Sequence, residues 1–229
     1  MTVEQIITRI KALGNPTDAE GMARFGINVE KAFGVRIPPL RKLAKEIGTD
    51  HELAQELWSS GYHEARILAS MIDDPKMVSE QQMEAWVLDF NSWDLCDQVI
   101  GNLFDKTDIA MEKAKEWTGR PEEYVKRAGF AMAAWAALHL KKLPDSEFEA
   151  FFPLMLREAT DSRNYVKKAV NWALRNIGKR NLALHAKAVA LAEQMAGMED
   201  KSARWIAADA LRELRSEKIL ARLREKEGK

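Results

Sequence analysis

An all-α fold built from repeated helix pairs is what the sequence predicts, and three observations lead to it. Apolar side chains recur at helical spacing along most of the 229 residues, with Ala, Leu, Lys, Glu and Arg between them. Only seven prolines and twelve glycines interrupt these segments, and strand-like alternation is absent from the sequence. Similar segments also return about 40 residues apart. With 46% apolar residues, the chain can bury a substantial core.

Helix boundaries are predicted where proline, glycine and acidic residues cluster. Proline has no backbone N–H and its ring clashes with the preceding turn, so it is tolerated at the start of a helix and ends one elsewhere. Glycine and aspartate favour the turns that join helices. In chain order, the boundaries are expected at residues 14–16 (Gly-Asn-Pro), 38–39 (Pro-Pro), 73–75 (Asp-Asp-Pro), 119–121 (Gly-Arg-Pro) and 143–145 (Leu-Pro-Asp).

Internal repeats predict how these helices are arranged. Residues 124–128 (Tyr-Val-Lys-Arg-Ala) return as 165–169 (Tyr-Val-Lys-Lys-Ala) after 41 residues, and the pattern of 166–177 returns at 203–214 after 37. Residues 63–69 are a weaker copy. A period of roughly 40 residues is typical of HEAT-type helix pairs. We therefore expect one domain over residues 1–229, a right-handed superhelical solenoid of HEAT-like antiparallel helix pairs whose second helices line a concave face.

Charge is balanced overall but divided between the two parts of the chain. Residues 157–229 hold 17 Lys+Arg and 10 Asp+Glu, which leaves 18 and 25 in residues 1–156, so the two parts carry +7 and −7. A basic part of this kind can neutralise the phosphates of a nucleic acid, although ordinary solvated helix faces explain the same charges. We expect phosphate contacts from basic residues that recur in the repeats, namely Arg127, Lys167, Lys168, Arg175 and Arg204.

Other features narrow the class of protein. The single Cys96 cannot form an internal disulfide, and no Cys/His cluster has the spacing of zinc ligands, so neither a metal nor a cofactor is expected. The first residues lack a secretory pattern, and no run of about eighteen apolar residues occurs. We expect a soluble, monomeric cytoplasmic protein that does not enter a membrane. Most tryptophans are expected to pack between repeats: Trp58, Trp86, Trp117, Trp135 and, with less support, Trp205.

Trp93 and Asp97 form the most informative pair in the sequence. Four-residue spacing puts an indole and a carboxylate on one face of a helix, and Ser92 or Asn91 is expected to cap that helix. An ionised carboxylate beside aromatic rings can stabilise a sugar cation and orient an attacking water. Each indole can contribute roughly 0.5–2 kcal/mol of cation–π attraction, and Trp172 is a second candidate. The alternative is that the tryptophans belong to the core and Asp97 is a solvated surface charge.

Several segments together carry a resemblance to a known family. The sequence is similar, over most of its length, to the bacterial AlkD-like DNA alkylation repair glycosylases, which are built from HEAT-like repeats. The specific segments are W-D-x-x-D and A-x-x-W-x-L-R, whereas the helical repeats are generic. The similar segments are residues 22–25 (Met-Ala-Arg-Phe), 34–38 (Gly-Val-Arg-Ile-Pro), 92–97 (Ser-Trp-Asp-Leu-Cys-Asp), 125–128 (Val-Lys-Arg-Ala) and 169–175 (Ala-Val-Asn-Trp-Ala-Leu-Arg).

The resemblance implies an enzyme of the bacterial cytosol or nucleoid that removes cationic N3- and N7-alkylated purines, such as 3-methyladenine and 7-methylguanine, from duplex DNA without base flipping. By resemblance, Asp97, Trp93 and Trp172 contact the deoxyribose of the lesion, and Arg127 helps to hold the DNA backbone. Phe25 is a departure, because the best-known type of the family has a tyrosine near the DNA there. Two alternatives remain: a non-catalytic module that binds bent, flapped or branched DNA, and a repeat scaffold for protein partners.

Overall fold

The computed structural model describes residues 1–227, which form helices α1 to α15 and one 3-10 helix, without a β-strand in that part of the chain. The helices fall into two compact units, Met1–Asp108 and a second unit that begins at Ile109. The expected all-α fold of helix pairs is confirmed, whereas the single-domain organisation stays a prediction.

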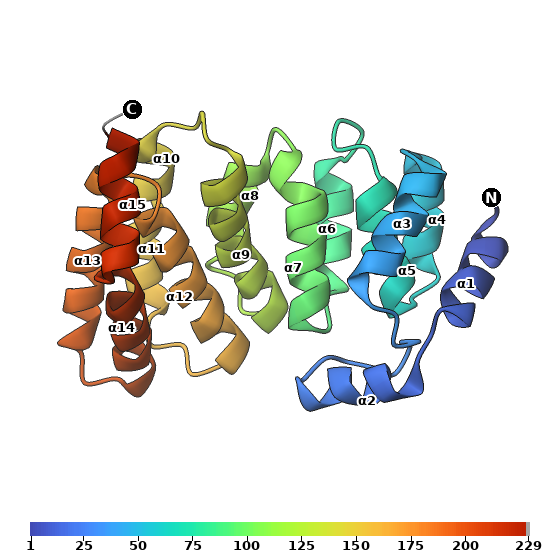
Figure 1. Cartoon of the computed structure of the whole chain (residues 1–229), viewed down its shortest axis with the longest axis horizontal. Coiled ribbons are helices and arrows are strands. Elements are labelled where there is room, and N and C mark those ends of the chain that lie inside the picture. The colour runs from blue at the N-terminus through green and yellow to red at the C-terminus, as the bar shows by residue number, and fades with distance from the viewer. Residues whose placement is uncertain (228–229) are drawn as a thin grey trace. The chain divides into compact units, whose positions relative to one another are not determined.

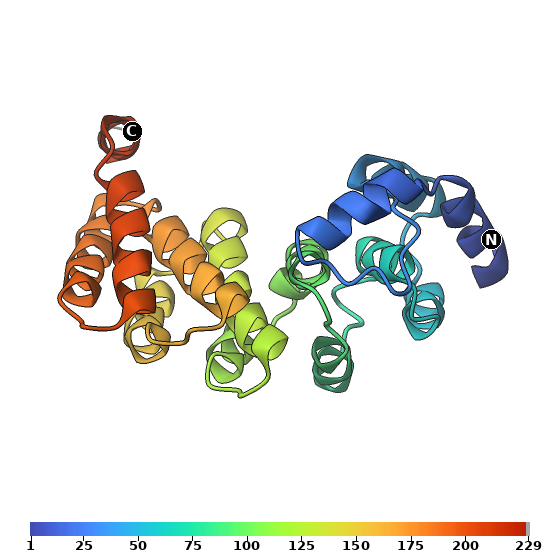
Figure 2. The ribbon, with the colours of Figure 1, turned by 90° about the horizontal axis from the view of Figure 1, so that it is seen from below.

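The first unit places α3, α5 and α7 side by side, with α4 packed against α5 and α1 packed against both α4 and α5 (Figure 1, Figure 2). Its helices are α1 (Val3–Ala12), α2 (Pro16–Arg24), α3 (Ile37–Ile47), α4 (His51–Ser59), α5 (His63–Ile72), α6 (Glu80–Leu88), α7 (Trp93–Asn102) and the 3-10 helix η1 (Phe104–Lys106). The rings of Trp58 and Trp86 stack in its core with centroids 3.9 Å apart, which confirms the expected packing role of both residues.

The second unit has two layers of helices. In one layer α12 packs between α9 and α14, and in the other α8, α11 and α13 pack behind their partners α9, α12 and α14 (Figure 1). We call α9, α12 and α14 the second-helix layer. The helices are α8 (Ala110–Trp117), α9 (Glu123–His139), α10 (Asp145–Glu149), α11 (Phe151–Glu158), α12 (Asn164–Gly178), α13 (Leu182–Ala196), α14 (Lys201–Leu214) and α15 (Glu217–Glu227).

A glycine allows α8 and α9 to pack closely. A β-carbon on Gly129 would lie 2.6 Å from the backbone nitrogen of Thr118 and 2.7 Å from the carbonyl oxygen of Ala114, distances at which atoms clash. Only glycine therefore fits this position of α9 without a shift of the backbone. Trp117, at the end of α8, is fully buried beside this contact, as the sequence predicted.

The predicted boundaries and repeats agree with the structure. Pro16 and Pro38 stand in the first turns of α2 and α3, α5 ends just before Asp73, and α10 begins directly after Pro144. Residues 119–121 separate α8 from α9. The repeated segments 124–128 and 165–169 occupy equivalent first turns of α9 and α12, where the rings of the two tyrosines stack with centroids 5.9 Å apart. The two segments are therefore copies of one structural unit.

Candidate functional site

Trp93 and Asp97 lie at the start of α7, as their spacing predicted. The helix begins at Trp93, so Asp97 follows one turn later on the same face. Both side chains are half-buried, whereas the intervening Leu95 and Cys96 are fully buried in the core. The pair therefore presents part of an indole and part of a carboxylate to solvent.

A buried polar network holds this first turn of α7. Asp94 accepts a hydrogen bond from the Ser92 hydroxyl (2.8 Å), and its other carboxylate oxygen lies 2.9 Å from Nε2 of His63 on α5. Burial raises the pKa of Asp94, but the hydrogen bond and charge of His63, with the bonds from Ser92 and the Leu95 backbone, outweigh it and lower the pKa overall. Asp94 is therefore a carboxylate that ties α7 to α5.

The network corrects one detail of the sequence analysis. Ser92 is the N-cap residue of α7, as expected, but its side chain makes no capping hydrogen bond to the helix backbone. Its hydroxyl proton is directed at the Asp94 carboxylate instead, because an ionised acceptor forms the stronger bond. The start of α7 was therefore predicted correctly, but the hydrogen-bond partner of the Ser92 side chain was not.

Phe25 is next to Trp93 in the folded chain. The indole Nε1 of Trp93 donates a hydrogen bond to the Phe25 carbonyl oxygen over 3.0 Å, although the two residues lie 68 positions apart. Phe25 caps the C-terminal end of α2 and is 75% exposed, the most exposed of the large apolar side chains that the structure describes. The structure thus brings together Phe25, Trp93 and Asp97, three residues that the sequence analysis selected separately.

The position of α2 depends on its two ends, because none of its residues is buried. At its C-terminal end is the contact with Trp93. At its N-terminal end, a β-carbon on Gly34 would lie 2.2 Å from the Asn15 carbonyl oxygen, and Gly34 also has a φ of +77°, so only glycine fits. The backbone N–H of Asn15 donates to the Phe33 carbonyl oxygen over 2.9 Å. The loop of residues 33–35 therefore determines where α2, and with it Phe25, is placed.

That loop is bound by one buried carboxylate. Glu64, on α5 and fully buried, accepts hydrogen bonds from the backbone N–H groups of Phe33 (2.9 and 3.0 Å), Gly34 (2.7 Å) and Val35 (3.1 Å). The dipoles of these N–H groups take the place of the water that the Glu64 side chain gives up on burial. His63 and Glu64 are neighbours on α5. His63 supports the first turn of α7, which carries Trp93, and Glu64 supports the loop that positions α2 and Phe25.

Arg127 and Trp172 belong to the second unit, on α9 and α12 of the second-helix layer. Arg127 is only 5% exposed, and its Nη1 donates to the Tyr165 carbonyl oxygen at 2.8 Å, so much of this guanidinium binds the neighbouring repeat. Trp172 is half-buried and meets the ring of Trp135 edge to face, with centroids 5.6 Å apart at 79°. Part of the Trp172 ring and a small part of Arg127 face solvent.

The four other residues that were predicted to bind phosphate differ in the contacts that they make within the protein. Arg175 forms an ion pair with Glu213 and lies 3.7 Å from the Asp209 carboxylate. The Lys167 ammonium lies over the ring of Trp205, 4.9 Å from its centroid. Lys168 and Arg204, on α12 and α14, are exposed, and among the described side chains, which end at residue 226, no acceptor or carboxylate engages them. Lys168 and Arg204 are therefore the pair best able to meet a phosphate without first breaking a protein contact.

Comparison with known proteins agrees with this architecture. The sequence profile of the DNA alkylation repair enzyme family matches residues 6–214. The chain belongs to that family. It is 24% identical over 199 residues to an uncharacterized protein, Lin0241, of Listeria innocua serovar 6a, which covers 85% of this chain and 87% of that protein.

A solved structure shows the same fold in a related protein. It is described as a new family of proteins related to the HEAT-like repeat DNA glycosylases with affinity for branched DNA structures, and it superposes with a TM-score of 0.79 at 23% identity, over 93% of this chain and 95% of that one. The fold of this family member is therefore of the HEAT-like repeat type. None of the helices described up to residue 227 combines the length and apolar character needed to cross a membrane. Within the same residues, no group of three or more His, Cys, Asp or Glu side chains is placed to hold a metal ion.

The sequence analysis missed the residues that support the site of this family member. Asp94 stands inside the W-D-x-x-D segment, but its partner His63 is 31 residues earlier, and nothing in the local sequence links the two. Glu64 follows His63 in a helix that was recognised only as a weak repeat. A charged residue inside an apolar helical stretch, as in residues 63–69 (His-Glu-Ala-Arg-Ile-Leu-Ala), was the one available sign of a buried carboxylate.

Proposed function

We propose that this protein is a DNA glycosylase that hydrolyses the N-glycosidic bond of positively charged N3- and N7-alkylated purines in duplex DNA. Membership of the DNA alkylation repair enzyme family supports a role in repair. The observation that carries the finer proposal is the half-buried Trp93 and Asp97 pair, one turn apart on α7, with the backbone carbonyl of the exposed Phe25 bound to the same indole.

The reaction suits a site with one carboxylate. When the C1′–N bond breaks, its electron pair goes to the alkylated purine and neutralises the positive charge, so the base leaves without protonation by the enzyme. Positive charge then develops on the deoxyribose, where the Asp97 carboxylate opposes it. A water molecule held by the same carboxylate forms the new C1′–O bond and releases its proton, which leaves an abasic site and a neutral alkylated base.

The remaining residues are proposed to hold the DNA. The partly exposed ring faces of Trp93 and Trp172 would attract the cationic sugar, and Phe25 would pack against the DNA beside Trp93. Arg127, Lys168 and Arg204 would contact phosphates, which position a duplex without reading its sequence. Neither a metal nor a cofactor is needed for this chemistry.

Binding of branched DNA without base excision is the second candidate function. The related solved structure is described as having affinity for branched DNA, and this chain shares its fold. The exposed cations Lys168 and Arg204 would serve both functions, because phosphate contacts are independent of base chemistry. The two functions differ in whether Asp97 is required.

Asp97→Asn tests the proposed glycosylase activity. The amide keeps the shape of the side chain but loses its charge, so release of 7-methylguanine and 3-methyladenine from methylated duplex DNA should fall by roughly 10² to 10³. Trp93→Ala and Trp172→Ala should each cost only about fivefold, which corresponds to about 1 kcal/mol of cation–π attraction. Asp108→Asn, which changes an exposed aspartate of the same unit, is the matched control and should retain full activity.

Two results would contradict the proposal. If the wild-type protein binds duplex or branched DNA but releases neither methylated base, the non-catalytic function is correct. If the Asp97→Asn variant releases both bases at the wild-type rate, Asp97 takes no part in the chemistry.

A further inference from the structure

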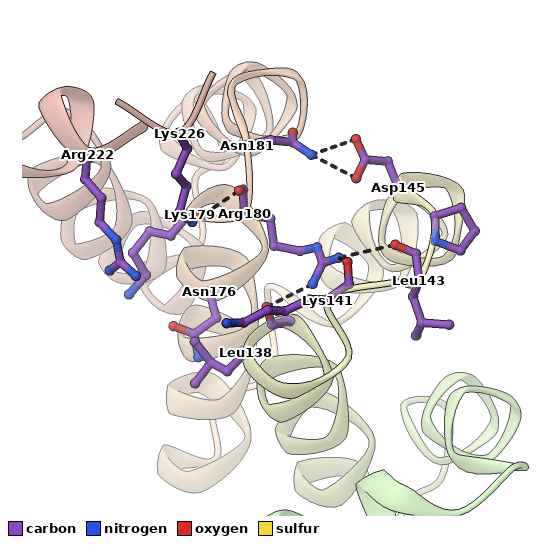
Figure 3. Close-up of a pocket in the computed structure, with 12 residues that line it drawn as sticks. Leu138, Lys141, Leu143, Asp145, Asn176, Lys179, Arg180, Asn181, Arg222 and Lys226 are labelled. Carbon is purple, nitrogen blue, oxygen red and sulfur yellow. Dashed lines mark hydrogen bonds between the residues drawn. The ribbon is translucent and has the colours of Figure 1, made fainter. Parts of the chain in front are cut away.

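A pocket in the second unit, outside the proposed DNA-binding residues, carries an unusual concentration of positive charge. It has a volume of about 450 Å³ and lies where the C-terminal ends of α9 and α12 meet α15 (Figure 3). One part of its wall is apolar, with Leu138, Leu143 and Pro144. In the other part, the described residues include five cations: Lys141, Lys179, Arg180, Arg222 and Lys226.

Few carboxylates offset these cations. Asp145 is the one acidic residue among the described residues that line the pocket, and both of its oxygens accept hydrogen bonds from Nδ2 of Asn181 at 2.9 Å rather than from a cation. The Lys179 ammonium pairs with Glu213 on α14 over 2.6 Å. Among the side chains of residues 1–226, which the structure describes, no carboxylate is in ion-pair contact with Lys141 or Arg222. The pocket therefore keeps a net positive charge after its internal pairs are counted.

Two of the cations also serve the fold, which explains part of this charge. Arg180 donates to the carbonyl oxygens of Ala137 (3.0 Å) and Leu143 (3.2 Å), and so closes the loop after α9. Lys226 donates to the carbonyl oxygens of Lys179 (3.2 Å) and Arg180 (3.3 Å), at the end of α12 (Figure 3). Cations are favourable at the C-terminal ends of helices because the last carbonyls carry partial negative charge.

Helix capping does not account for Lys141 and Arg222, whose side chains donate to no carbonyl oxygen in the part of the chain that the structure describes. The cations also disfavour one another: burial lowers the pKa of Lys226, and the nearby charges of Arg222, Arg180 and Lys141 lower it further. Lys141 and Arg222 therefore add repulsion to this group of cations. A bound anion removes the repulsion, because it gives these charges a shared partner.

We infer that this pocket binds a small phosphate-bearing anion with at least two negative charges, of the size of pyrophosphate or a nucleoside diphosphate. The volume falls within the range of roughly 300–1,000 Å³ typical of small-molecule sites. The exposed Leu138, with Leu143 and Pro144, offers an apolar surface to the organic part of such a ligand. Lys168 on α12 and Lys179, the C-cap residue of that helix, are eleven positions apart, or about 16 Å along the helix axis, so the pocket is separate from the proposed phosphate contacts of the DNA.

The test is isothermal titration of the full chain with pyrophosphate and with ADP. The double variant Lys141→Ala with Arg222→Ala removes two cations that form no hydrogen bond or ion pair with the described side chains, so it should fold normally, and a circular dichroism melt checks this. Affinity for the probe that binds should fall about tenfold per removed charge, or roughly a hundredfold in all. The control double variant, Lys142→Ala with Arg224→Ala, changes exposed cations from the same loop and the same helix that lie outside the pocket.

The two probes separate the possible sources of the phosphate. Binding of pyrophosphate alone indicates an inorganic anion, and tighter binding of ADP indicates a nucleotide; either result supports the inference. The inference would be overturned if neither probe gave a heat of binding up to about 5 mM. Such a result means a binding free energy weaker than about −3 kcal/mol. A second result would also overturn the inference: the Lys141 and Arg222 double variant loses affinity for duplex DNA but binds both probes as the wild type does. The two cations would then contact the DNA backbone. The inference does not depend on the proposed glycosylase activity.

Discussion

The buried carboxylate of Glu64 should be needed both for the stability of the first unit and for the position of α2. In a Glu64→Ala variant the N–H groups of Gly34 and Val35, both buried, lose their acceptor. Each buried donor left without a partner costs about 1–3 kcal/mol, so the free energy of unfolding should fall by about 2–6 kcal/mol. In Glu64→Gln the amide oxygen can take the place of Oε1, which accepts from all three N–H groups, and only the charge is lost. The expected cost is smaller, about 1–3 kcal/mol.

Two measurements check this prediction. Urea denaturation gives the free energy of unfolding, with Glu56→Ala as the control because that glutamate is exposed on the neighbouring α4. Limited proteolysis reports on α2 itself: none of its residues is buried, so loss of the Glu64 contact should expose residues 16–36 to cleavage before the rest of the unit. A Glu64→Ala variant with the stability of the Glu56→Ala control, or with no faster cleavage in this region, would refute the argument that one carboxylate anchors the loop.

Two further predictions concern the Asp94 network and the exposed cations. The lowered pKa of Asp94 means that its contribution to stability is present above the ordinary aspartate pKa of about 3.9 and is lost as pH falls through the lowered value. The difference in unfolding free energy between wild type and Asp94→Asn should therefore shrink when urea melts are repeated from about pH 6 to about pH 3, and a constant difference would show that the pairing with His63 contributes nothing. The double variant Lys168→Ala with Arg204→Ala should reduce the slope of log affinity for duplex DNA against log salt concentration by about 1.8. Arg175→Ala should change this slope less, because Arg175 is already paired with Glu213 in the protein. Equal effects of these variants would mean that the ion pairs of Arg175 break when DNA binds.

Much of the fold follows from the sequence alone, because helix formation depends on neighbours within a few positions. The boundaries at Pro16, Pro38 and Pro144 follow from a missing N–H and a fixed φ, which act whatever the rest of the chain does. The equivalence of residues 124–128 and 165–169 follows from two copies of one pattern that bury the same face. The shared face of Trp93 and Asp97 follows from helical periodicity.

Tertiary structure decided what those residues contact, since these partners are distant in the sequence. The bond from Trp93 to the Phe25 carbonyl spans 68 positions, and the His63–Asp94 contact spans 31. The sequence marked Arg127 as a cation but did not show that it is buried against the next repeat, where the Tyr165 carbonyl fixes it. Such contacts form only when helices that are far apart in the chain pack together. Their geometry is therefore set by the shape of the packed repeats, which no local pattern of residues encodes.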